Sequence, residues 1–323
     1  MKKFLSLTLA IILVIVSVLA LSSCGKKTDD AIKVTTLNGT TGFGMAPLMK
    51  DHSLGDTKND YEFSVESDPS VVTAGLMNGT IDIAALPTNA AANVYNKTNG
   101  GVQIIAINTL GVLYVVTNGV EINSISDLEG KTIYCPAQNP LFITKYILEK
   151  NGLTGKVTVD STAYAKPDAL RDAVKAGAVE IAILPEPMVT IAKSSNQNVK
   201  VALDLTEEWN KISDGKQLVQ GCVVVRTEFA NEYPGSVKSF LKEYKKSIEA
   251  VNDDPEGSAS AIKEFGIFAN ENVAKNAIPK CNIAYMDGED MKEAMQNFLE
   301  AMNSIAPESI GKAIPGDDFY YGA

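Results

Sequence analysis

The chain has few of the side chains that usually perform catalysis or hold a metal. It contains one histidine, His52, and four cysteines that are widely separated in the sequence. Neither a Cys-x-x-Cys pair nor a cluster of cysteine and histidine occurs, so we expect no zinc site and no other imidazole-rich metal site. A Gly-x-Ser-x-Gly elbow with a histidine partner is also missing. The sequence therefore favours binding over catalysis, and we expect no cofactor.

Polar residues are concentrated where predicted strands end. Ligands of open parallel sheets lie beyond the carboxyl ends of the strands, so these segments form the candidate binding site. Some of them contain glycines just ahead of a predicted helix, whose free N–H groups suit an anionic group. The residues that we expect to contact a ligand are Asn38, Gly39, Thr41, Gly42, Phe43, Asp68, Thr88, Asn89, Tyr114, Gln138, Asn139 and Glu186.

Each of these candidates also has a purely structural interpretation. The glycines would then form a turn without a ligand, and Thr88 and Asn89 would cap the helix that follows them. Tyr114 and Phe43 either stack on a ligand or pack inside the protein. Asp68 belongs to an Asp-Pro-Ser sequence that is also an ordinary helix start.

The charge of the candidate loops indicates the kind of ligand. They contain no arginine or lysine, so a fully anionic solute would depend on N–H groups alone. Glu186 stands between Pro185 and Pro187, which restrict the backbone around its carboxylate; a solvated loop is the alternative. Glu186 and Asp68 together favour a ligand with an amino or amidine-like group.

Alternating strand and helix patterns must position these loops. Short β-branched runs predict strands, and segments with helical periodicity follow most of them. The predicted strands are 32–37, 61–66, 81–86, 103–107, 113–117, 132–135, 157–160 and 180–184, and the predicted helices are 44–50, 69–77, 90–97, 141–151 and 167–176. This alternation predicts an α/β protein with parallel sheets and helices on both faces. From Tyr233 onward the pattern is helical, and the apolar stripe within 236–251 is typical of core packing.

An internal repeat divides this α/β body. Residues 79–87 (GTIDIAALP) match residues 177–185 (GAVEIAILP) at a constant offset of 98 residues. In both copies a glycine ends a helix, an acidic residue opens a strand and a proline ends it. Because the copies occupy the same place in two successive β-α-β-α-β units, we predict two similar lobes whose strand ends face each other across a cleft.

The N-terminus carries an export signal. Two lysines precede an apolar or small-residue run over 4–21, and small residues come just before Cys24. An uncleaved signal anchor is the alternative, because the run is nearly long enough to span a bilayer. The residues LSSC that end at Cys24 resemble a bacterial lipobox. This resemblance implies a lipoprotein signal peptide over 1–23, lipid on Cys24 and a polar tether over 24–30.

The overall charge limits the partners of the chain. It has 29 basic and 39 acidic residues, so the mature chain would carry about −12 once the two leader lysines are removed. Nucleic acid requires a basic face, so we expect no nucleic-acid partner. The same acidity argues against electrostatic adhesion to anionic headgroups, which leaves lipid on Cys24 as the expected membrane attachment.

Six segments carry a resemblance to a known family. They are the loop 38–45, GTIDIAALPTNAAAN at 79–93, LGVLYVVT at 110–117, SDLEGKTI at 126–133, 182–188 and GCVVVRTEF at 221–229. Together they resemble the solute-binding proteins of ABC importers in the nitrate, sulfonate and taurine group, which also contains pyrimidine-precursor binders related to THI5-like proteins. Each segment is weakly specific, but their order covers nearly the whole mature chain.

The resemblance implies a type II periplasmic-binding-protein fold, with lobe I formed by 31–114 plus 221–323 and lobe II by 115–220. Two crossings, near 113–117 and 219–225, would form the hinge on which the lobes close. It also implies an extracytoplasmic monomer, lipid-anchored to the bacterial cell membrane, that delivers a small solute to an ABC permease and its ATPase. The acidic loops favour an aminopyrimidine thiamine precursor or a zwitterion such as taurine over a simple oxyanion.

Three cysteines remain if Cys24 carries lipid: Cys135, Cys222 and Cys281. Outside the cytoplasm, an odd number allows at most one internal disulfide. Cys222 and Cys281 both fall in the expected lobe I, so they are the pair that we expect if a bond forms. Three buried thiols are the alternative.

Two other functions are available to the same fold. A THI5-like pyrimidine-synthesis enzyme would need a reactive histidine, a lysine-bound pyridoxal phosphate and a cysteine-rich motif. His52 instead sits in the charged stretch 50–60, away from every predicted strand end. A solute-sensing input module is the second alternative, and the sequence offers no feature that separates it from an importer component.

Overall fold

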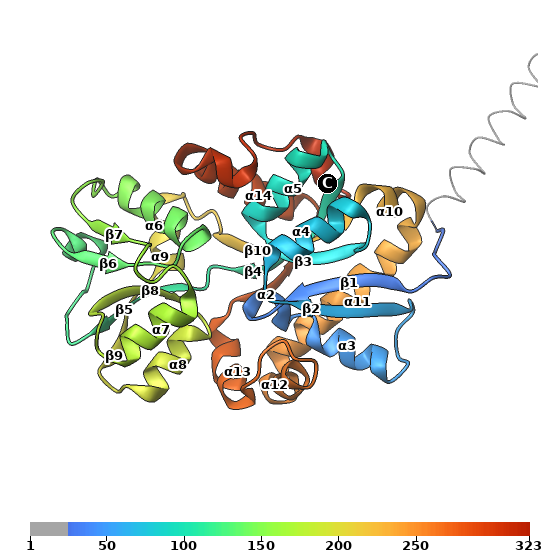
Figure 1. Cartoon of the computed structure of the whole chain (residues 1–323). Coiled ribbons are helices and arrows are strands. Elements are labelled where there is room, and N and C mark those ends of the chain that lie inside the picture. The colour runs from blue at the N-terminus through green and yellow to red at the C-terminus, as the bar shows by residue number, and fades with distance from the viewer. Residues whose placement is uncertain (1–24) are drawn as a thin grey trace, which may run out of the picture.

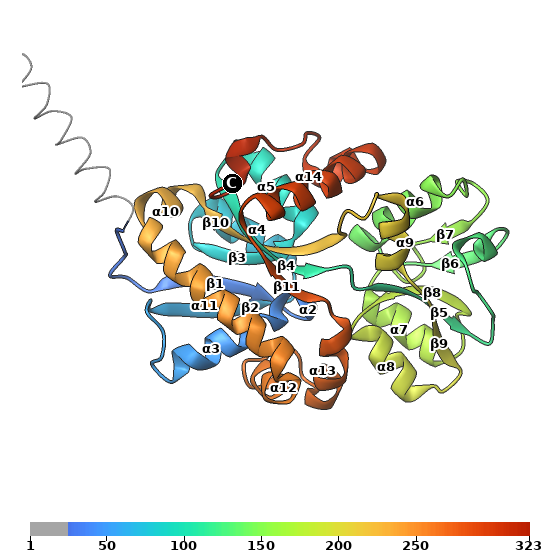
Figure 2. The ribbon, with the colours of Figure 1, turned by 180° about the vertical axis from the view of Figure 1, so that it is seen from behind.

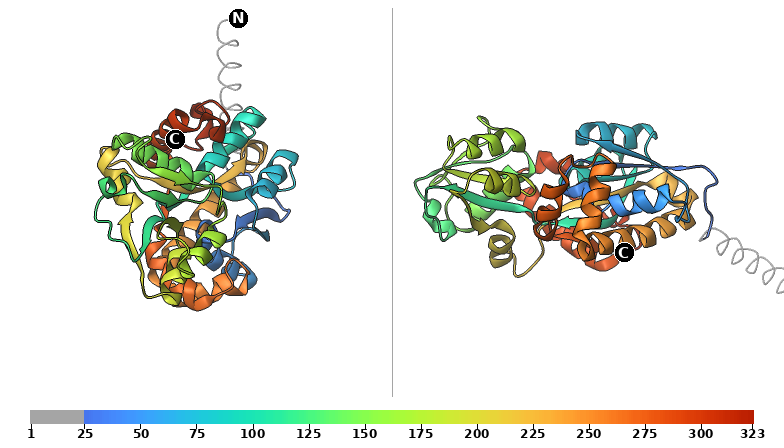
Figure 3. Two further views of the ribbon diagram at one scale, coloured as in Figure 1. Left: turned by 60° about the vertical axis from the view of Figure 1, so that its left-hand side comes forward. Right: turned by 90° about the horizontal axis from the view of Figure 1, so that it is seen from below.

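The computed structural model describes residues 25–323, which form two α/β lobes that lie end to end (Figures 1 and 3). Each lobe has its own sheet with helices packed against it. The signal peptide predicted over 1–23 and the lipidation predicted at Cys24 lie outside the described residues. Among residues 25–323, no helix has both the length and the apolar content needed to cross a bilayer.

The first lobe is built on a six-stranded sheet with the order β11-β4-β10-β3-β1-β2. Its strands are β1 (Ile32–Leu37), β2 (Tyr61–Glu66), β3 (Ile83–Pro87), β4 (Val102–Leu110), β10 (Val219–Arg226) and β11 (Ile283–Met286). Its helices are α2 (Thr40–Phe43), α3 (Ala46–Ser53), α4 (Pro69–Asn78), α5 (Thr88–Thr98), α10 (Thr227–Glu232), α11 (Pro234–Asp253), α12 (Pro255–Glu264), α13 (Glu271–Ala277) and α14 (Gly288–Ile305). Short 3-10 turns follow at Ile278–Lys280, Pro307–Ile310 and Asp317–Phe319.

The second lobe is built on a five-stranded sheet with the order β7-β6-β8-β5-β9. Its strands are β5 (Leu113–Asn118), β6 (Thr132–Tyr134), β7 (Thr158–Asp160), β8 (Ile181–Pro185) and β9 (Val199–Asp204). Its helices are α6 (Asn139–Lys150), α7 (Pro167–Lys175), α8 (Met188–Ser195) and α9 (Leu205–Ile212), with a 3-10 turn at Ile125–Leu128. The α/β class predicted from the strand and helix alternation is confirmed.

The sheets are mixed, which corrects the expectation of parallel sheets. In the first sheet β1 is parallel to β2 and β3, whereas β10 is antiparallel to β3 and β4. In the second sheet β6 is parallel to β7 and β8, whereas β5 is antiparallel to β8 and β9. β5 and β10, which run against both of their neighbours, are the strands by which the chain enters each sheet after passing from the other lobe.

The sequence repeat corresponds to a structural repeat. Gly79 ends α4 with a φ angle of 79°, and Gly177 ends the turn after α7 with a φ angle of 76°. Both have a left-handed conformation that favours glycine. The strands that follow, β3 and β8, each lie between one parallel and one antiparallel neighbour. The two halves of the repeat therefore hold the same position in the two sheets.

The chain leaves the first sheet after Leu110 and enters the second at Leu113, and it returns over residues 213–218. Figure 2 shows both passages from behind. The boundary that we expected after residue 114 falls inside β5, so Tyr114 belongs to the second sheet and not to the crossing itself. The first passage is tied to the start of β10, directly after the return passage, because Val112 N donates a hydrogen bond to Gln220 Oε1 at 2.7 Å.

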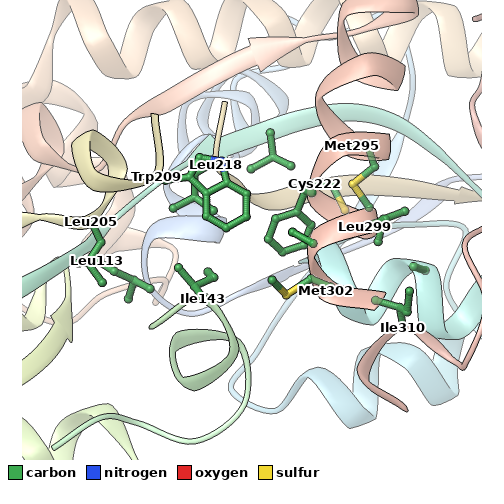
Figure 4. Close-up of a cluster of buried hydrophobic side chains, with 14 of the residues drawn as sticks. Leu113, Ile143, Leu205, Trp209, Leu218, Cys222, Met295, Leu299, Met302 and Ile310 are labelled. Carbon is green, nitrogen blue, oxygen red and sulfur yellow. The ribbon is translucent and has the colours of Figure 1, made fainter. Parts of the chain in front are cut away.

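A continuous apolar cluster joins the lobes. It contains buried side chains from β3, β4, α5 and α14 of the first lobe and from β5, β6, α6 and α9 of the second. Figure 4 shows Trp209 of α9 among Ile143 of α6 and Met302 of α14. Separate clusters cover the other face of each sheet. The stripe predicted on α11 is confirmed as core, since Phe240 and Tyr244 are fully buried.

The first described residues are not a free tether. Gly235 N donates to Lys26 O at 2.8 Å, and Thr28 N donates to Ser236 Oγ at 3.1 Å. Lys26 also pairs with Glu232 and lies 4.6 Å from the centre of the Tyr233 ring. The segment predicted to be a polar tether over 24–30 is therefore attached to the start of α11 from Lys26 onward.

The cysteines within residues 25–323 are buried free thiols, as in the alternative with three buried thiols, and the possible bond between Cys222 and Cys281 is not formed. Cys222 lies in the cluster that joins the lobes, whereas Cys281 lies in the cluster on the opposite face of the first sheet. The sheet separates them. Burial raises the pKa of the Cys135 thiol to about 12 and also raises the pKa of the Cys222 and Cys281 thiols.

We expect these three thiols to react only when the protein unfolds. Native protein treated with iodoacetamide should keep Cys135, Cys222 and Cys281 unmodified, because the thiolate is scarce and the sulfur is covered. Denaturation without reductant should expose all three to alkylation, as read by peptide mass spectrometry. If Cys222 and Cys281 became reactive only after a reductant was added, the free-thiol assignment would be wrong.

Candidate functional site

The carboxyl ends of the parallel strands meet at the crossing between the lobes. Pro87, at the end of β3, pairs with Gly221, which in turn pairs with Thr109 near the end of β4. Pro185, at the end of β8, pairs with Leu113 at the start of β5. Since Thr109 and Leu113 are close in the chain, the strand ends of both lobes face the same region, as the sequence predicted.

The glycine-rich loop after β1 is held rigidly beside this region. Gly39 has a φ of 84°, and a Cβ at Gly42 would collide with Leu37 O, so both positions require glycine. Asn108 Nδ2, from β4, donates to Thr41 O at 3.0 Å. Asn38 is exposed after the strand. The loop thus brings Asn38, Gly39, Thr41 and Gly42 to the end of the first sheet.

Phe43 belongs to the core and not to the site. Its side chain is fully buried, and its ring packs edge-to-face against Phe268 with the centroids 6.1 Å apart. The structure therefore supports the packing interpretation of this residue and corrects its assignment as a ligand contact.

Thr88 and Asn89 lie in the first turn of α5, but neither caps that helix. Thr88 Oγ1 donates to Val219 O at 3.0 Å, which ties α5 to the second passage between the lobes. Asn89 is only 7% exposed, and its Oδ1 is buried without a hydrogen-bond partner. Buried polar atoms are nearly always paired, so this oxygen is an unusual feature of the site.

Gln138 and Asn139 begin α6 in the second lobe. Gln138 is exposed and has φ 67° and ψ −130°, a conformation that non-glycine residues seldom adopt. Asn139 is 9% exposed, and its Oδ1 is also buried without a partner. Each lobe therefore presents one unpaired amide oxygen from the first turn of a helix that follows a parallel strand.

Thr206 adds a third unpaired group at the crossing itself. Its Oγ1 is buried without a partner, and a Cβ at Gly111 would collide with it, so the hydroxyl lies directly against the first passage. Asn282 Nδ2 donates to Gly111 O at 2.6 Å from the start of β11. The backbone of the crossing is therefore enclosed by polar side chains from both lobes.

Glu186 is placed at the crossing, but its carboxylate is neither solvated nor free for a ligand. The residue is 2% exposed, and its backbone N donates to Val112 O at 3.0 Å. The carboxylate accepts hydrogen bonds from Thr190 N and Thr190 Oγ1, both at 3.0 Å, at the start of α8. Burial raises the pKa of this carboxyl, and the bonds from Thr190 oppose that shift. Its role here is to satisfy the helix start.

Tyr114 bridges the lobes. Its ring is buried, and its hydroxyl donates to Lys280 O at 2.9 Å. Burial raises the pKa of Tyr114, and the nearby Asp204 and Glu186 raise it further. Tyr114 is therefore neutral and holds the second lobe against the turn before β11.

Asp68 is an exposed helix cap. Its Oδ1 accepts a hydrogen bond from Ser70 N at 2.8 Å, and this bond is the main cause of its lowered pKa. The positive charge of Lys166, in the second lobe, makes a smaller contribution to lowering that pKa. The helix-start interpretation holds for this residue.

His52 lies away from the crossing, at the end of α3. Its Nδ1 is 3.2 Å from Thr57 Oγ1, and its ring contacts Tyr61 and Phe63 edge-on. Residues 25–323 contain no group of three or more His, Cys, Asp and Glu side chains arranged to hold a metal ion. Five pockets of about 330 to 600 Å³ on the described surface are lined by residues other than the predicted contacts.

The lobes also touch beside the crossing. Trp209 of α9 lies 4.9 Å from Tyr146 of α6 and 6.1 Å from Phe298 of α14, measured between ring centroids. On the opposite side, α13 of the first lobe packs against α8 of the second. The lobes are thus in contact through helices at two places besides the crossing.

Comparison with known proteins assigns the chain to a family. A family model described as menaquinone biosynthesis matches residues 43–303. The chain belongs to this family. No curated protein sequence matches it.

Solved structures similar to this menaquinone-biosynthesis family member include solute-binding proteins. An ABC transporter protein from Parabacteroides distasonis has a TM-score of 0.77 at 23% identity, covering 90% of this chain and 99% of the other. The periplasmic aliphatic sulphonate binding protein SsuA from Escherichia coli has a TM-score of 0.70 at 11% identity, covering 90% and 98%. The periplasmic nitrate-binding protein NrtA from Synechocystis has a TM-score of 0.59 at 12% identity, covering 87% and 84%. The fold is that of type II periplasmic binding proteins, as predicted.

Sequence reasoning missed several polar residues of the site, and two of them organise it. Asn108 anchors the glycine-rich loop, and Gln220 ties the first passage to the start of β10. Each is a polar residue in an apolar strand sequence, Asn108 within IIAINTL and Gln220 within LVQGCVVV. A buried amide in such an apolar run needs a hydrogen-bond partner. This requirement could have marked both residues as candidates for a structural role at the site.

We expect the raised pKa of Glu186 to lower stability as pH rises. The folded state binds the proton more tightly than the unfolded state, so the unfolding free energy decreases from pH about 4.3 up through the raised pKa. The difference in unfolding free energy between the wild type and Glu186→Gln, measured in urea across this range, should therefore fall with increasing pH.

Asp68→Asn is the matched control with the opposite sign, because the pKa of Asp68 is lowered. The advantage of the wild type over this variant should appear as pH rises through the lowered pKa, and it should be complete above the ordinary aspartate range. A Glu186→Gln difference that did not change with pH would contradict the assignment.

Proposed function

We propose that the protein is the extracytoplasmic solute-binding protein of an ABC importer, which holds a small polar solute between its lobes. The observation that carries the proposal is the pair of buried, unpaired amide oxygens on Asn89 and Asn139, one from each lobe. Leaving a buried polar atom unpaired costs on the order of 1–3 kcal/mol. A solute that donates to both oxygens would remove this cost and would favour contact between the lobes.

The chemistry around these oxygens supports a solute with N–H or O–H donors. The unpaired atoms are two amide oxygens and the hydroxyl of Thr206, and no predicted contact residue is an arginine or lysine. The carboxylate of Glu186 already accepts hydrogen bonds from the start of α8. We therefore assign the selectivity for amino groups to the amide oxygens of Asn89 and Asn139 in place of this carboxylate. An aminopyrimidine thiamine precursor or taurine carries such donors, as does a related sulfonate that has an amino or hydroxyl group.

The location and partners follow from the N-terminal sequence and from the fold. The lipobox resemblance supports export and lipid on Cys24, which would keep the protein beside a membrane permease and its ATPase as a monomer. The similarity to solute-binding structures supports this role at the level of the fold. A hinge at residues 111–112 and 213–218 would let the lobes separate for solute entry.

A biosynthetic enzyme is the second candidate, and the match to the menaquinone-biosynthesis family favours it. The position of His52 argues against the pyrimidine-synthesis variant, which needs a reactive histidine. An enzyme would convert the bound compound, whereas a receptor would release it unchanged. Mass spectrometry of a solute recovered after incubation with the protein separates the two.

We expect Asn89→Ala and Asn139→Ala to weaken solute binding without destabilising the protein. Each variant should lose one hydrogen bond to the solute, which corresponds to about a threefold to tenfold increase in Kd. The unfolding free energy without solute should stay the same or rise, because an unpaired buried oxygen is removed. Asn198→Ala, at an exposed position in the second lobe, is the control and should bind as the wild type does.

The measurement is isothermal calorimetry after a thermal-shift screen of aminopyrimidines, sulfonates, oxyanions, amino acids and aromatic carboxylates. Binding of an oxyanion alone, with wild-type affinity in both asparagine variants, would refute the proposed site. Chemical conversion of a bound compound would show that the protein is an enzyme and not a receptor.

A further inference from the structure

A second hollow lies on the first lobe, outside the candidate site. It is a groove of about 450 Å³ between α11, β11 and the end of the chain. The residues that line it are Pro234, Lys238, Leu241, Lys242, Lys245, Tyr285, Asp287 and Tyr321. We call it the α11 groove. Its floor is apolar and aromatic, and lysines line one side.

The lysines of the α11 groove are unusually available for an anionic partner. Lys238, Lys242 and Lys245 are spaced four and three residues apart, so they lie on one face of α11. Lys238 and Lys242 are exposed and form no ion pair within residues 25–323. Lys245 Nζ lies 5.6 Å from the centre of the Tyr285 ring. In a chain with ten more acidic than basic residues, such a cluster of unpaired cations is a local exception.

One acidic residue lies in the α11 groove. Asp287 Oδ2 accepts a hydrogen bond from the Tyr285 hydroxyl at 2.8 Å, so this carboxylate is engaged by the groove floor. The nearest acidic residue on α11 itself, Glu243, is directed to the other side, where its carboxylate accepts from Lys58 N and the Tyr61 hydroxyl. The lysine side of the groove therefore keeps its positive charge.

The α11 groove lies next to the point where the described chain begins. Gly235 N donates to Lys26 O, and the neighbouring Pro234 lines the groove. Lys26 and Lys27 add two further cations at this end of α11, although Lys26 is paired with Glu232. Figure 2 shows α11 running across this face from the corner where residues 25–30 join the lobe. Any membrane anchor at Cys24 would therefore be two residues away from Lys26, where the chain is fixed beside the groove.

We propose that the α11 groove binds the headgroups of anionic phospholipids and so lays the first lobe on the membrane. The inference rests on the membrane anchoring that is part of the proposed function. An anchor holds the groove at high effective concentration next to the headgroups, so a few lysines are enough to keep the groove bound to them. Tyr285, Tyr321 and Leu241 supply the amphipathic surface that suits the boundary between water and lipid. The acidic remainder of the protein would face away, which fixes its orientation.

Lysine footprinting of the reconstituted full chain tests this orientation. The protein is inserted into vesicles of phosphatidylcholine alone or of phosphatidylcholine with phosphatidylglycerol, and acetylation of each lysine is measured by mass spectrometry. We expect Lys238 and Lys242 to be acetylated severalfold more slowly only when phosphatidylglycerol is present, and high salt should restore their reaction. Lys145 and Lys200, exposed on the second lobe, should react equally in both vesicles.

A charge-reversal pair provides the second readout. In Lys238→Glu/Lys242→Glu the protection of Lys245 by phosphatidylglycerol should be lost, whereas Lys145→Glu/Lys200→Glu should keep it. Equal acetylation of Lys238 and Lys242 in the two vesicles would overturn the proposal. Protection that appears only in native membranes, and not in vesicles of lipid alone, would assign the groove to a protein partner and would overturn it as well.

Failure of the proposed function is visible separately. A protein that does not float with phosphatidylcholine vesicles has no anchor, and both the anchoring and the groove proposal then fail. If the protein floats and its lysines are protected, but calorimetry detects no solute binding, the groove proposal stands and the proposed receptor function fails.

Discussion

The structure depends on how the two sheets share the short passage at Gly111 and Val112. Val112 gives its N–H to Gln220 and accepts from Glu186 N, so this residue links the start of β10 and the end of β8 to the same point. β8 is paired directly with β5, which follows the passage, and β3 is linked to β4, which precedes the passage, through β10 between them. The ends of β3 and β8 therefore cannot move away from the passage without breaking the sheets. The meeting of the polar strand ends is thus a consequence of strand pairing.

Much of the fold could be predicted from the sequence, because strand and helix periodicity are local properties. The strand 32–37, the strand 61–66 and the repeat at 79–87 and 177–185 are where the pattern placed them. The mixed sheet order could not be predicted, because it is set by which strands lead out of and back into each sheet. At the site, the glycine positions were readable from the sequence. Phe43 and Glu186 were assigned to a ligand, because the packing of Phe43 against Phe268 and the hydrogen bonds from Thr190 to the Glu186 carboxylate depend on the folded structure.

The charged residues show why local environment outweighs overall composition. The net charge predicted a chain without affinity for anionic surfaces, yet unpaired lysines gather along one face of α11. In the same way, the two prolines around Glu186 suggested a carboxylate held at the cleft for a ligand, whereas this carboxylate is buried and accepts a hydrogen bond from the start of α8. In both cases the sequence gives the number and position of the charged residues, but which of them are paired depends on how the chain packs.

Trp209 is the only tryptophan of the chain, and it lies between a tyrosine of the second lobe and a phenylalanine of α14. Its indole nitrogen is buried without a hydrogen bond. Separation of the lobes would bring water to this ring and shift its emission to longer wavelength. The fluorescence of Trp209 would therefore report separation of the lobes without an added label.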